Sequence, residues 1–104
     1  MSPRNLKIFI TGVSGLLGNN LACYFRDRND VIGLYHSNRV EIPQALTVKG
    51  DITDSKDIQR IIHRFQPDIL IHCASLTNID FCETHKAAAH RINVEGTRSI
   101  VQSL

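Results

Sequence analysis

Apolar and polar positions follow one another along this chain in blocks that predict strands and helices in turn. Short apolar runs at 6–10, 31–35, 46–48 and 68–72 indicate four buried strands. Between the first two runs, apolar residues recur at helical spacing from about position 16 to about position 28. A second helix is predicted from apolar residues at i, i+3, i+4 and i+7, namely Ile58, Ile61, Ile62 and Phe65.

Local signals set the ends of the second helix, and a third helix completes the pattern. Thr53 or Asp54 is a suitable N-cap for the second helix. Pro67 ends it, because the residue before a proline avoids the helical conformation. The segment from about position 84 to position 104 is predicted to be helical.

The resulting order is strand, helix, strand, strand, helix, strand, helix, which is typical of an α/β fold. Apolar strands that alternate with helices favour a parallel sheet with helices on both faces. Right-handed crossovers leave few topologies, and the expected strand order is 3-2-1-4. The topological switch point then lies between the first and fourth strands, where open α/β sheets bind ligands.

Length and composition limit the classes of protein that remain. The 104 residues have room for one small domain, 1–104, without a visible repeat or linker. The net charge of +2 is weak and the basic residues are scattered, so we expect no nucleic-acid partner. No signal segment or long apolar stretch is visible, so we expect no membrane partner and a cytoplasmic location. Three cysteines without a framework spacing suit free thiols in a reducing compartment.

Three glycines between the first strand and the first helix carry the strongest chemical signal. Gly12, Gly15 and Gly18 are spaced G-x-x-G-x-x-G. Such glycines let the backbone turn tightly and approach a pyrophosphate, which the N–H groups and dipole of the helix start then hold. The alternative is a plain strand-to-helix turn with close packing.

The motif Thr11-Gly12-x-x-Gly15-x-x-Gly18 resembles the signature of the extended short-chain dehydrogenases/reductases. Within them, the stretches 67–83 and 93–97 are similar to the dTDP-4-dehydrorhamnose reductase group. The resemblance covers essentially all of the chain. It implies a Rossmann-type domain, truncated to the first half of a doubly wound sheet, with NADPH or NADH as cofactor.

The resemblance also implies which residues hold the cofactor. Asp51 and Ile52 are expected beside the adenine, although Asp51 also suits a turn before a helix cap. Cys73 is expected under the nicotinamide-side ribose as a small apolar filler rather than a reactive thiol. The full predicted set comprises Gly12, Ser14, Gly15, Leu16, Leu17, Gly18, Ser37, Arg39, Asp51, Ile52, Cys73, Ala74, Ser75, Thr77 and Asn93.

The end of the second strand bears on the choice between NAD and NADP. An acidic residue there would bind the ribose 2′-OH, whereas a basic residue accommodates a 2′-phosphate. The segment 35–39 has no acid before Glu41, and Arg39 suits a bidentate contact with phosphate. We therefore expect NADPH to be preferred, the alternative being that Arg39 is a solvated loop residue.

Histidines and cysteines gather in the second half of the chain, which raises the alternative of a metal site. Cys82-x-x-His85 has a tolerable ligand spacing, and His72, Cys73 and His90 lie nearby in the sequence. There is no second paired motif, and Cys73 lies at a strand end. We predict no metal.

The resemblance places catalysis in a Ser or Thr and a Tyr-x-x-x-Lys pair, which the chain lacks, since neither Tyr24 nor Tyr35 has a lysine four residues on. We therefore expect a cofactor-binding fragment without catalytic residues, whose fourth strand forms an apolar edge that favours self-association.

Two functions remain open. The parent is a reductase that transfers hydride to a 4-keto nucleotide sugar, as in dTDP-rhamnose biosynthesis. Alternatively, it is a non-catalytic NADP-binding regulator that resembles the methionine adenosyltransferase beta subunit.

Overall fold

The computed structural model describes residues 5–74 and 96–103. Within it the chain divides into two compact units. The first consists of Met1–Lys49 and Gln66–Cys73, and the second of Gly50–Phe65 and Ala74–Leu104. Each unit is described by itself below.

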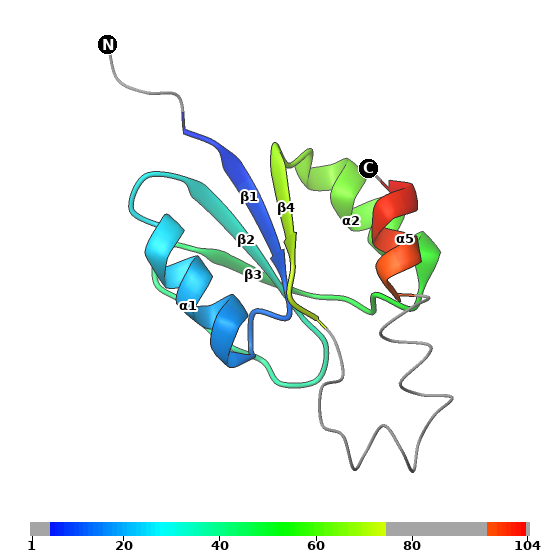
Figure 1. Cartoon of the computed structure of the whole chain (residues 1–104), viewed down its shortest axis with the longest axis horizontal. Helices are drawn as coiled ribbons and strands as arrows, with labels where there is room; N and C mark the ends of the chain where they lie inside the picture. Colours follow the sequence, from blue (N-terminus) through cyan, green and yellow to red (C-terminus); the bar gives the residue numbers. More distant parts are fainter. Residues whose placement is uncertain (1–4, 75–95, 104) are drawn as a thin grey trace. The chain divides into compact units, whose positions relative to one another are not determined.

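A parallel sheet of four strands is the centre of the first unit (Figure 1). The strands are β1 (Lys7–Thr11), β2 (Asp30–Tyr35), β3 (Leu46–Lys49) and β4 (Ile69–His72). Their order is β3-β2-β1-β4, so the predicted order 3-2-1-4 and the α/β class are confirmed. In register, Thr11 pairs with Leu34 on one side and with His72 on the other. The carboxyl ends of three strands therefore meet at one edge of the sheet.

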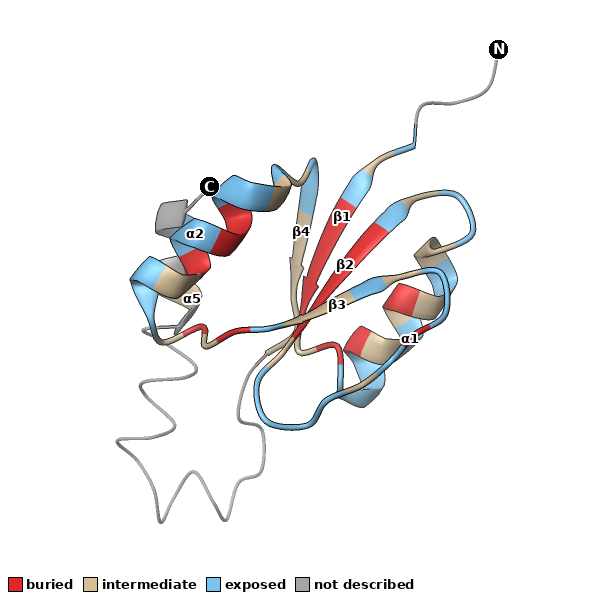
Figure 2. Cartoon of the chain, turned by 180° about the vertical axis from the view of Figure 1, so that it is seen from behind, coloured by how far each residue is buried: buried red, intermediate tan, exposed pale blue. Residues whose placement is uncertain are grey.

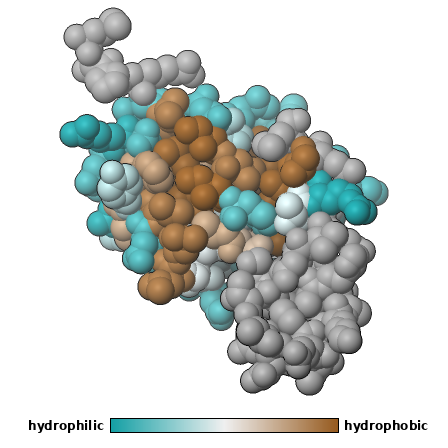
Figure 3. Space-filling model, in the orientation of Figure 1, coloured by the Kyte–Doolittle hydropathy of each residue, from teal (hydrophilic) through white to brown (hydrophobic). Residues whose placement is uncertain are grey.

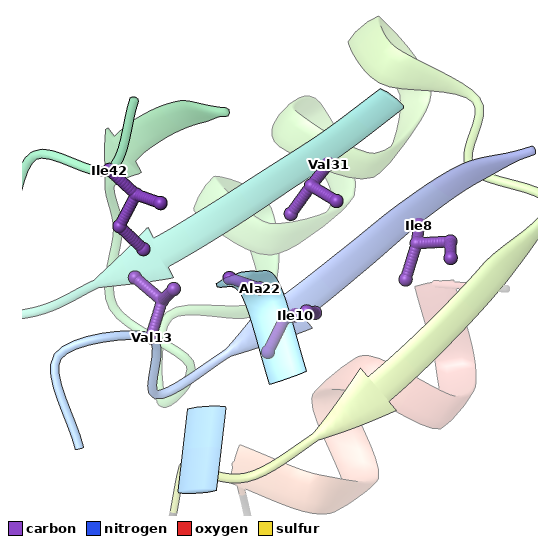
Figure 4. Packing of buried hydrophobic residues seen from close by; sticks show 6 residues of the cluster. All are labelled: Ile8, Ile10, Val13, Ala22, Val31 and Ile42. Carbon is purple, nitrogen blue, oxygen red and sulfur yellow. The ribbon is translucent and has the colours of Figure 1, made fainter. Parts of the chain in front are cut away.

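Helix α1 (Leu16–Phe25) packs against β1 and β2 and encloses the core of this unit. Figure 4 shows how side chains from β1, the following loop, α1, β2 and the segment before β3 point toward one another. The six residues drawn there form one buried cluster, namely Ile8, Ile10, Val13, Ala22, Val31 and Ile42. Because the cluster includes a residue of the loop itself, hydrophobic burial holds that loop to the sheet.

Helix α1 ends at Phe25, earlier than the predicted end near position 28. The backbone N–H and the side-chain amide of Asn29 both donate to the Phe25 carbonyl, each at 3.1 Å. The Asn29 side-chain oxygen in turn accepts from the Leu6 N–H at 3.3 Å. The backbone bond has the helical i→i−4 spacing, so it is the Asn29 side chain that marks the end of the helix, because it caps the Phe25 carbonyl and joins the turn to Leu6 before β1.

Burial decreases from the centre of the sheet to its edges, as Figure 2 shows by colour. Strands β1 and β2 are buried along almost their whole length. Strand β3 and strand β4 are half-buried, and Ile69 at the start of β4 is 42% exposed. Among the described residues, β4 therefore forms one edge of the sheet.

The second unit contains α2 (Ser55–Phe65) and α5 (Gly96–Ser103), which pack against each other. Of the four residues predicted for the apolar face of α2, Ile58, Ile61 and Ile62 are buried and Phe65 is half-buried. Ile100 of α5 is buried as well. Beyond α2, Gln66 has a φ of 50°, the left-handed conformation in which helices often end, and Pro67 follows.

None of the helices in the described ranges 5–74 and 96–103 is long and apolar enough to cross a membrane.

Candidate functional site: a glycine loop at the sheet switch point

Between β1 and α1 the chain makes a tight turn that only glycine accommodates without strain. Gly12 has a φ of 70°, in the left-handed region that side chains with a Cβ disfavour. Its carbonyl accepts a hydrogen bond from the Gly15 N–H at 3.0 Å, which closes the turn. The first glycine of the predicted motif is therefore required by backbone conformation.

The third glycine is required by close packing instead. A Cβ built on Gly18 would lie 2.3 Å from the carbonyl oxygen of Gly12 and 2.9 Å from its carbonyl carbon. Both atoms belong to the backbone, so no side chain can move aside. Helix α1 thus starts in direct contact with the turn that precedes it.

A second close contact ties the loop to β2. The Val13 N–H donates to the Leu34 carbonyl at 3.1 Å, and the Val13 side chain is fully buried. A Cβ on Gly33 would lie 2.7 Å from a methyl carbon of Val13. Gly33 is not among the predicted site residues, although an isolated glycine inside a strand is a recognised signal of close approach.

Among the described residues, no side chain caps the amino end of α1, where the positive end of the helix dipole lies. Gly15 is its N-cap residue in an extended conformation, with no side-chain cap, and the first turn contains no acid. The first helical hydrogen bond is donated by Asn19 to the Gly15 carbonyl at 2.9 Å. The N–H groups of 16–18 precede that bond, which is the arrangement that binds anions at a helix start.

Exposed side chains surround this helix start. Ser14 and Gly15 are exposed, and so are Leu16 and Leu17, at 83% and 63%. The apolar surface in Figure 3 extends to this end of α1. Of the six predicted residues of the loop, these four are exposed, whereas Gly12 is half-buried and Gly18 is buried against the turn.

The loop after β2 carries the predicted contacts of a 2′-phosphate. Ser37 and Arg39 are both exposed there, and the Ser37 hydroxyl lies 3.3 Å from the His36 Nδ1. One guanidinium nitrogen of Arg39 donates to Glu41 at 3.1 Å. With side chains 73% and 79% exposed, this ion pair is worth at most about 1 kcal/mol, so a phosphate can displace the carboxylate.

The loop after β4 begins next to the end of β1. The Cys73 N–H donates to the Thr11 hydroxyl at 3.0 Å and to the Thr11 carbonyl at 3.2 Å. The Thr11 hydroxyl also lies 2.6 Å from the His72 Nδ1. Burial raises the pKa of the Cys73 thiol, which agrees with its expected role as an unreactive filler. Ala74 follows and is half-buried.

Asp51 and Ile52 belong to the second unit. The Asp51 Oδ1 accepts from the Thr53 N–H at 2.9 Å and from the Thr53 hydroxyl at 2.6 Å. The Asp51 N–H donates to the Asp57 carboxylate at 3.1 Å. Asp51 therefore occupies the turn that the sequence analysis named as its alternative role, while Ile52 is buried. Contact with adenine stays a prediction for both.

Three predicted residues, Ser75, Thr77 and Asn93, lie outside the described residues. So do Cys82, His85 and His90 of the metal alternative. Over 5–74 and 96–103, no group of three metal-ligating side chains comes together. The absence of a metal stays a prediction.

An open hollow of about 490 Å³ lies elsewhere on the first unit, lined by 41–43 and 45–47. It lies before and at the amino end of β3. The glycine loop follows the carboxyl end of β1. In a parallel sheet, the hollow and the loop therefore lie at opposite ends of the strands. We therefore do not assign the hollow to the loop's site.

The family model of the RmlD substrate binding domain matches residues 6–103. The chain belongs to this family. The dTDP-4-dehydrorhamnose reductase of Mycobacterium tuberculosis is 30% identical over 104 residues, 99% of this chain and 30% of that protein. Methionine adenosyltransferase 2 subunit beta of Bos taurus is 30% identical over 100 residues, 94% of this chain and 28% of that protein. The chain thus spans less than a third of these relatives.

Solved structures show the same fold. A hypothetical dTDP-4-dehydrorhamnose reductase from Sulfolobus tokodaii is 37% identical, with a TM-score of 0.82 over 94% of this chain and 34% of that chain. The enzyme WbmH of Bordetella bronchiseptica, in complex with NAD+, is 26% identical, with a TM-score of 0.79 over 96% of this chain and 35% of that chain. The resemblance stated from the motifs is confirmed.

Proposed function

We propose that the glycine loop binds the pyrophosphate of a nicotinamide dinucleotide, with NADPH preferred. This proposal is based on the geometry of the loop. Gly12 and Gly18 permit a tight backbone turn, and the first turn of the helix that follows contains no carboxylate. The NAD+ complex of the similar enzyme WbmH supports the cofactor class. The preference for NADPH is based on Arg39 and the exposed, weakly held pair it forms with Glu41.

The residues present fit such a cofactor. The N–H groups at the start of α1 bind the pyrophosphate, while Ser37 and Arg39 bind the 2′-phosphate. The family resemblance predicts in addition that Asp51 and Ile52 contact the adenine, and that Cys73, Thr77 and Asn93 belong to the nicotinamide side. When bound, the cofactor supplies a hydride; the chain's own residues bind and orient it.

For the protein that contains this chain, we propose reduction of a 4-keto nucleotide sugar. The support is the membership of the RmlD family and the similarity to reductases named for dTDP-4-dehydrorhamnose. The test is consumption of NADPH by the intact protein on addition of dTDP-4-dehydrorhamnose. A protein that binds NADPH and leaves it unoxidised in that assay contradicts the reductase proposal.

The cofactor proposal is tested separately by titrating the intact protein with NADPH and NADH and following nucleotide fluorescence. NADPH is expected to bind more tightly. Arg39→Ala should weaken NADPH about tenfold, the effect of one charge-assisted contact, and leave NADH unchanged. Glu41→Gln is the matched control and should keep or improve NADPH affinity. Equal affinity for both nucleotides would remove the preference.

A regulatory function is the second candidate. The observation that favours it is the 30% identity with methionine adenosyltransferase 2 subunit beta over 94% of the chain. A regulator would bind NADPH, show no reductase activity, and form a complex with a methionine adenosyltransferase catalytic subunit in size-exclusion chromatography. Turnover of the keto sugar without such a complex would favour the reductase.

A further inference from the structure

Three residues join β1 to β4 at the point where both strands end. Thr11 and His72 are register partners on adjacent parallel strands. The Thr11 Oγ1 lies 2.6 Å from the His72 Nδ1 and accepts from the Cys73 N–H at 3.0 Å. Gly12 of the phosphate loop follows Thr11 directly, and the loop after β4 begins at Cys73. The Thr11 hydroxyl therefore joins the ends of β1 and β4, beside the backbone hydrogen bond from the Cys73 N–H to the Thr11 carbonyl at 3.2 Å.

The hydroxyl of Thr11 is held by protein groups rather than by bulk water. Thr11 is fully buried, although it is polar. A threonine hydroxyl has one proton to donate and two lone pairs that accept. The Cys73 N–H occupies one lone pair, and the His72 Nδ1, at 2.6 Å from the same oxygen, either accepts the hydroxyl proton or donates its own.

The state of the imidazole follows from its surroundings. Burial lowers the pKa of His72, which favours the neutral ring. A neutral imidazole has one N–H and one nitrogen that accepts. If the proton is on Nε2, the Nδ1 accepts the Thr11 hydroxyl proton, and a lone pair of the hydroxyl oxygen accepts from the Cys73 N–H.

We propose that His72 is a positioning residue of the glycine-loop site: its Nδ1 accepts the Thr11 proton and fixes the hydroxyl that holds the Cys73 N–H. The effect is to set the distance between Gly12, where the glycine loop begins, and Cys73, where the segment after β4 begins. His72 itself touches no reacting atom. The consequence for cofactor affinity rests on the proposed function, whereas the hydrogen bond and the tautomer do not.

The tautomer is tested on the wild-type protein by ¹⁵N NMR of the histidine side chains, with His72→Asn used to assign the His72 signals. We expect a protonated Nε2 and an unprotonated, hydrogen-bonded Nδ1 above the pKa of the ring. A protonated Nδ1 would overturn the proposal. This measurement needs neither a cofactor nor a variant that loses the contact.

Affinity for NADPH is tested with matched variants at both ends of the contact. His72→Leu should weaken binding about tenfold, the effect of one lost hydrogen bond. His72→Asn should stay within about threefold of wild type, because its side-chain oxygen can stand near the position of Nδ1. Thr11→Ser keeps the hydroxyl and should likewise bind, whereas Thr11→Val should resemble His72→Leu. If His72→Asn and His72→Leu bind NADPH with the same affinity, the proposal fails.

A double-mutant cycle separates positioning from general destabilisation. If His72 acts through the Thr11 hydroxyl, Thr11→Val combined with His72→Leu should lose no more affinity than either change alone. Additive losses would contradict the proposal. If wild type binds neither NADPH nor NADH, the cofactor proposal fails by itself, and the same cycle on the midpoint of thermal unfolding still decides whether the two side chains are coupled.

Discussion

The two helices α1 and α2 begin in opposite ways. Helix α2 starts behind Asp54, whose Oδ1 accepts from the N–H groups of Lys56 and Asp57 at 3.1 and 3.2 Å. Asp57 adds a carboxylate in the first turn. Helix α1 starts behind Gly15, with no side-chain cap and no acid in its first turn.

The difference shows what each helix start is for. An N-terminal carboxylate satisfies free N–H groups and the helix dipole, which stabilises the fold. A helix start without one is less stable by itself but keeps its N–H groups for an anion from outside. Within one small chain, α2 uses its own side chains at this position, while α1 has none there, which is the basis for the ligand that we propose.

The largest expected effect comes from filling the space at the start of α1. Gly18→Ala places a Cβ 2.3 Å from the Gly12 carbonyl oxygen, so helix and turn must separate. We expect about 1–3 kcal/mol of lost stability and NADPH binding weakened on the order of 100-fold, as one or two contacts to charged phosphate are lost. Chemical denaturation and fluorescence titration measure the two effects.

Gly15→Ala is the matched control for that change. Its Cβ would meet the Gly12 carbonyl oxygen at 3.4 Å, an ordinary contact, and the φ of Gly15 is −81°. The alanine variant should lose far less affinity than Gly18→Ala. Similar losses for both variants would show that steric contact with the turn is not what Gly18 avoids.

Giving α1 a carboxylate cap like that of α2 should keep or slightly raise the stability of the protein and weaken NADPH binding. Gly15 already has the extended conformation of an N-cap residue, so Gly15→Asp can cap the helix with its own carboxylate. We expect unchanged or slightly raised stability, by a few tenths of a kcal/mol, and NADPH affinity lowered at least about tenfold by competition and repulsion. Gly15→Asn, which caps without charge, separates these two causes. An aspartate variant that binds NADPH normally would contradict the assignment of the loop.

Removing the cap of α2 should affect stability alone. Asp54→Ala is expected to lower the free energy of unfolding by about 1 kcal/mol, with NADPH affinity within about twofold of wild type. Asp54→Asn retains the capping acceptor and should remain near wild type. Thermal and urea unfolding measure the effect. A large loss of affinity in Asp54→Ala would mean that the two helix starts are not functionally separate.

The smallest expected effect is a dependence of stability on pH near the loop. The pKa of His72 in the folded chain is below its ordinary value of 6.5 because burial disfavours the charged ring. Between the two values the unfolded chain binds more protons, so this contribution is fully present above about pH 6.5 and is lost as the pH falls through the folded pKa. The effect is small because the ring is only half-buried. Between about pH 5 and pH 8, the free energy of unfolding should therefore change less with pH in His72→Asn than in wild type. The same pH dependence in both proteins would refute this account.

Much of the fold and the centre of the site followed from local sequence features. The four strands, the apolar face of α2 and the requirement for Gly12 each depend on residues close together in the chain. Other features needed the structure. The N-cap of α2 is Asp54 rather than Thr53, because Thr53 instead donates to Asp51. Helix α1 ends earlier than its apolar spacing predicts, and the Asn29 side chain caps the Phe25 carbonyl there.

The sequence by itself determined the alternation of strands and helices and the position of the glycine loop, because hydrophobic period and backbone freedom are local properties. Only the tertiary structure brought Val13 against Gly33 and Thr11 against His72. The second pair is 61 residues apart, so its contact depends on strand order and register. The order was predicted from the alternation of strands and helices, but the register is decided by burial across the whole sheet, and no short stretch of sequence contains it.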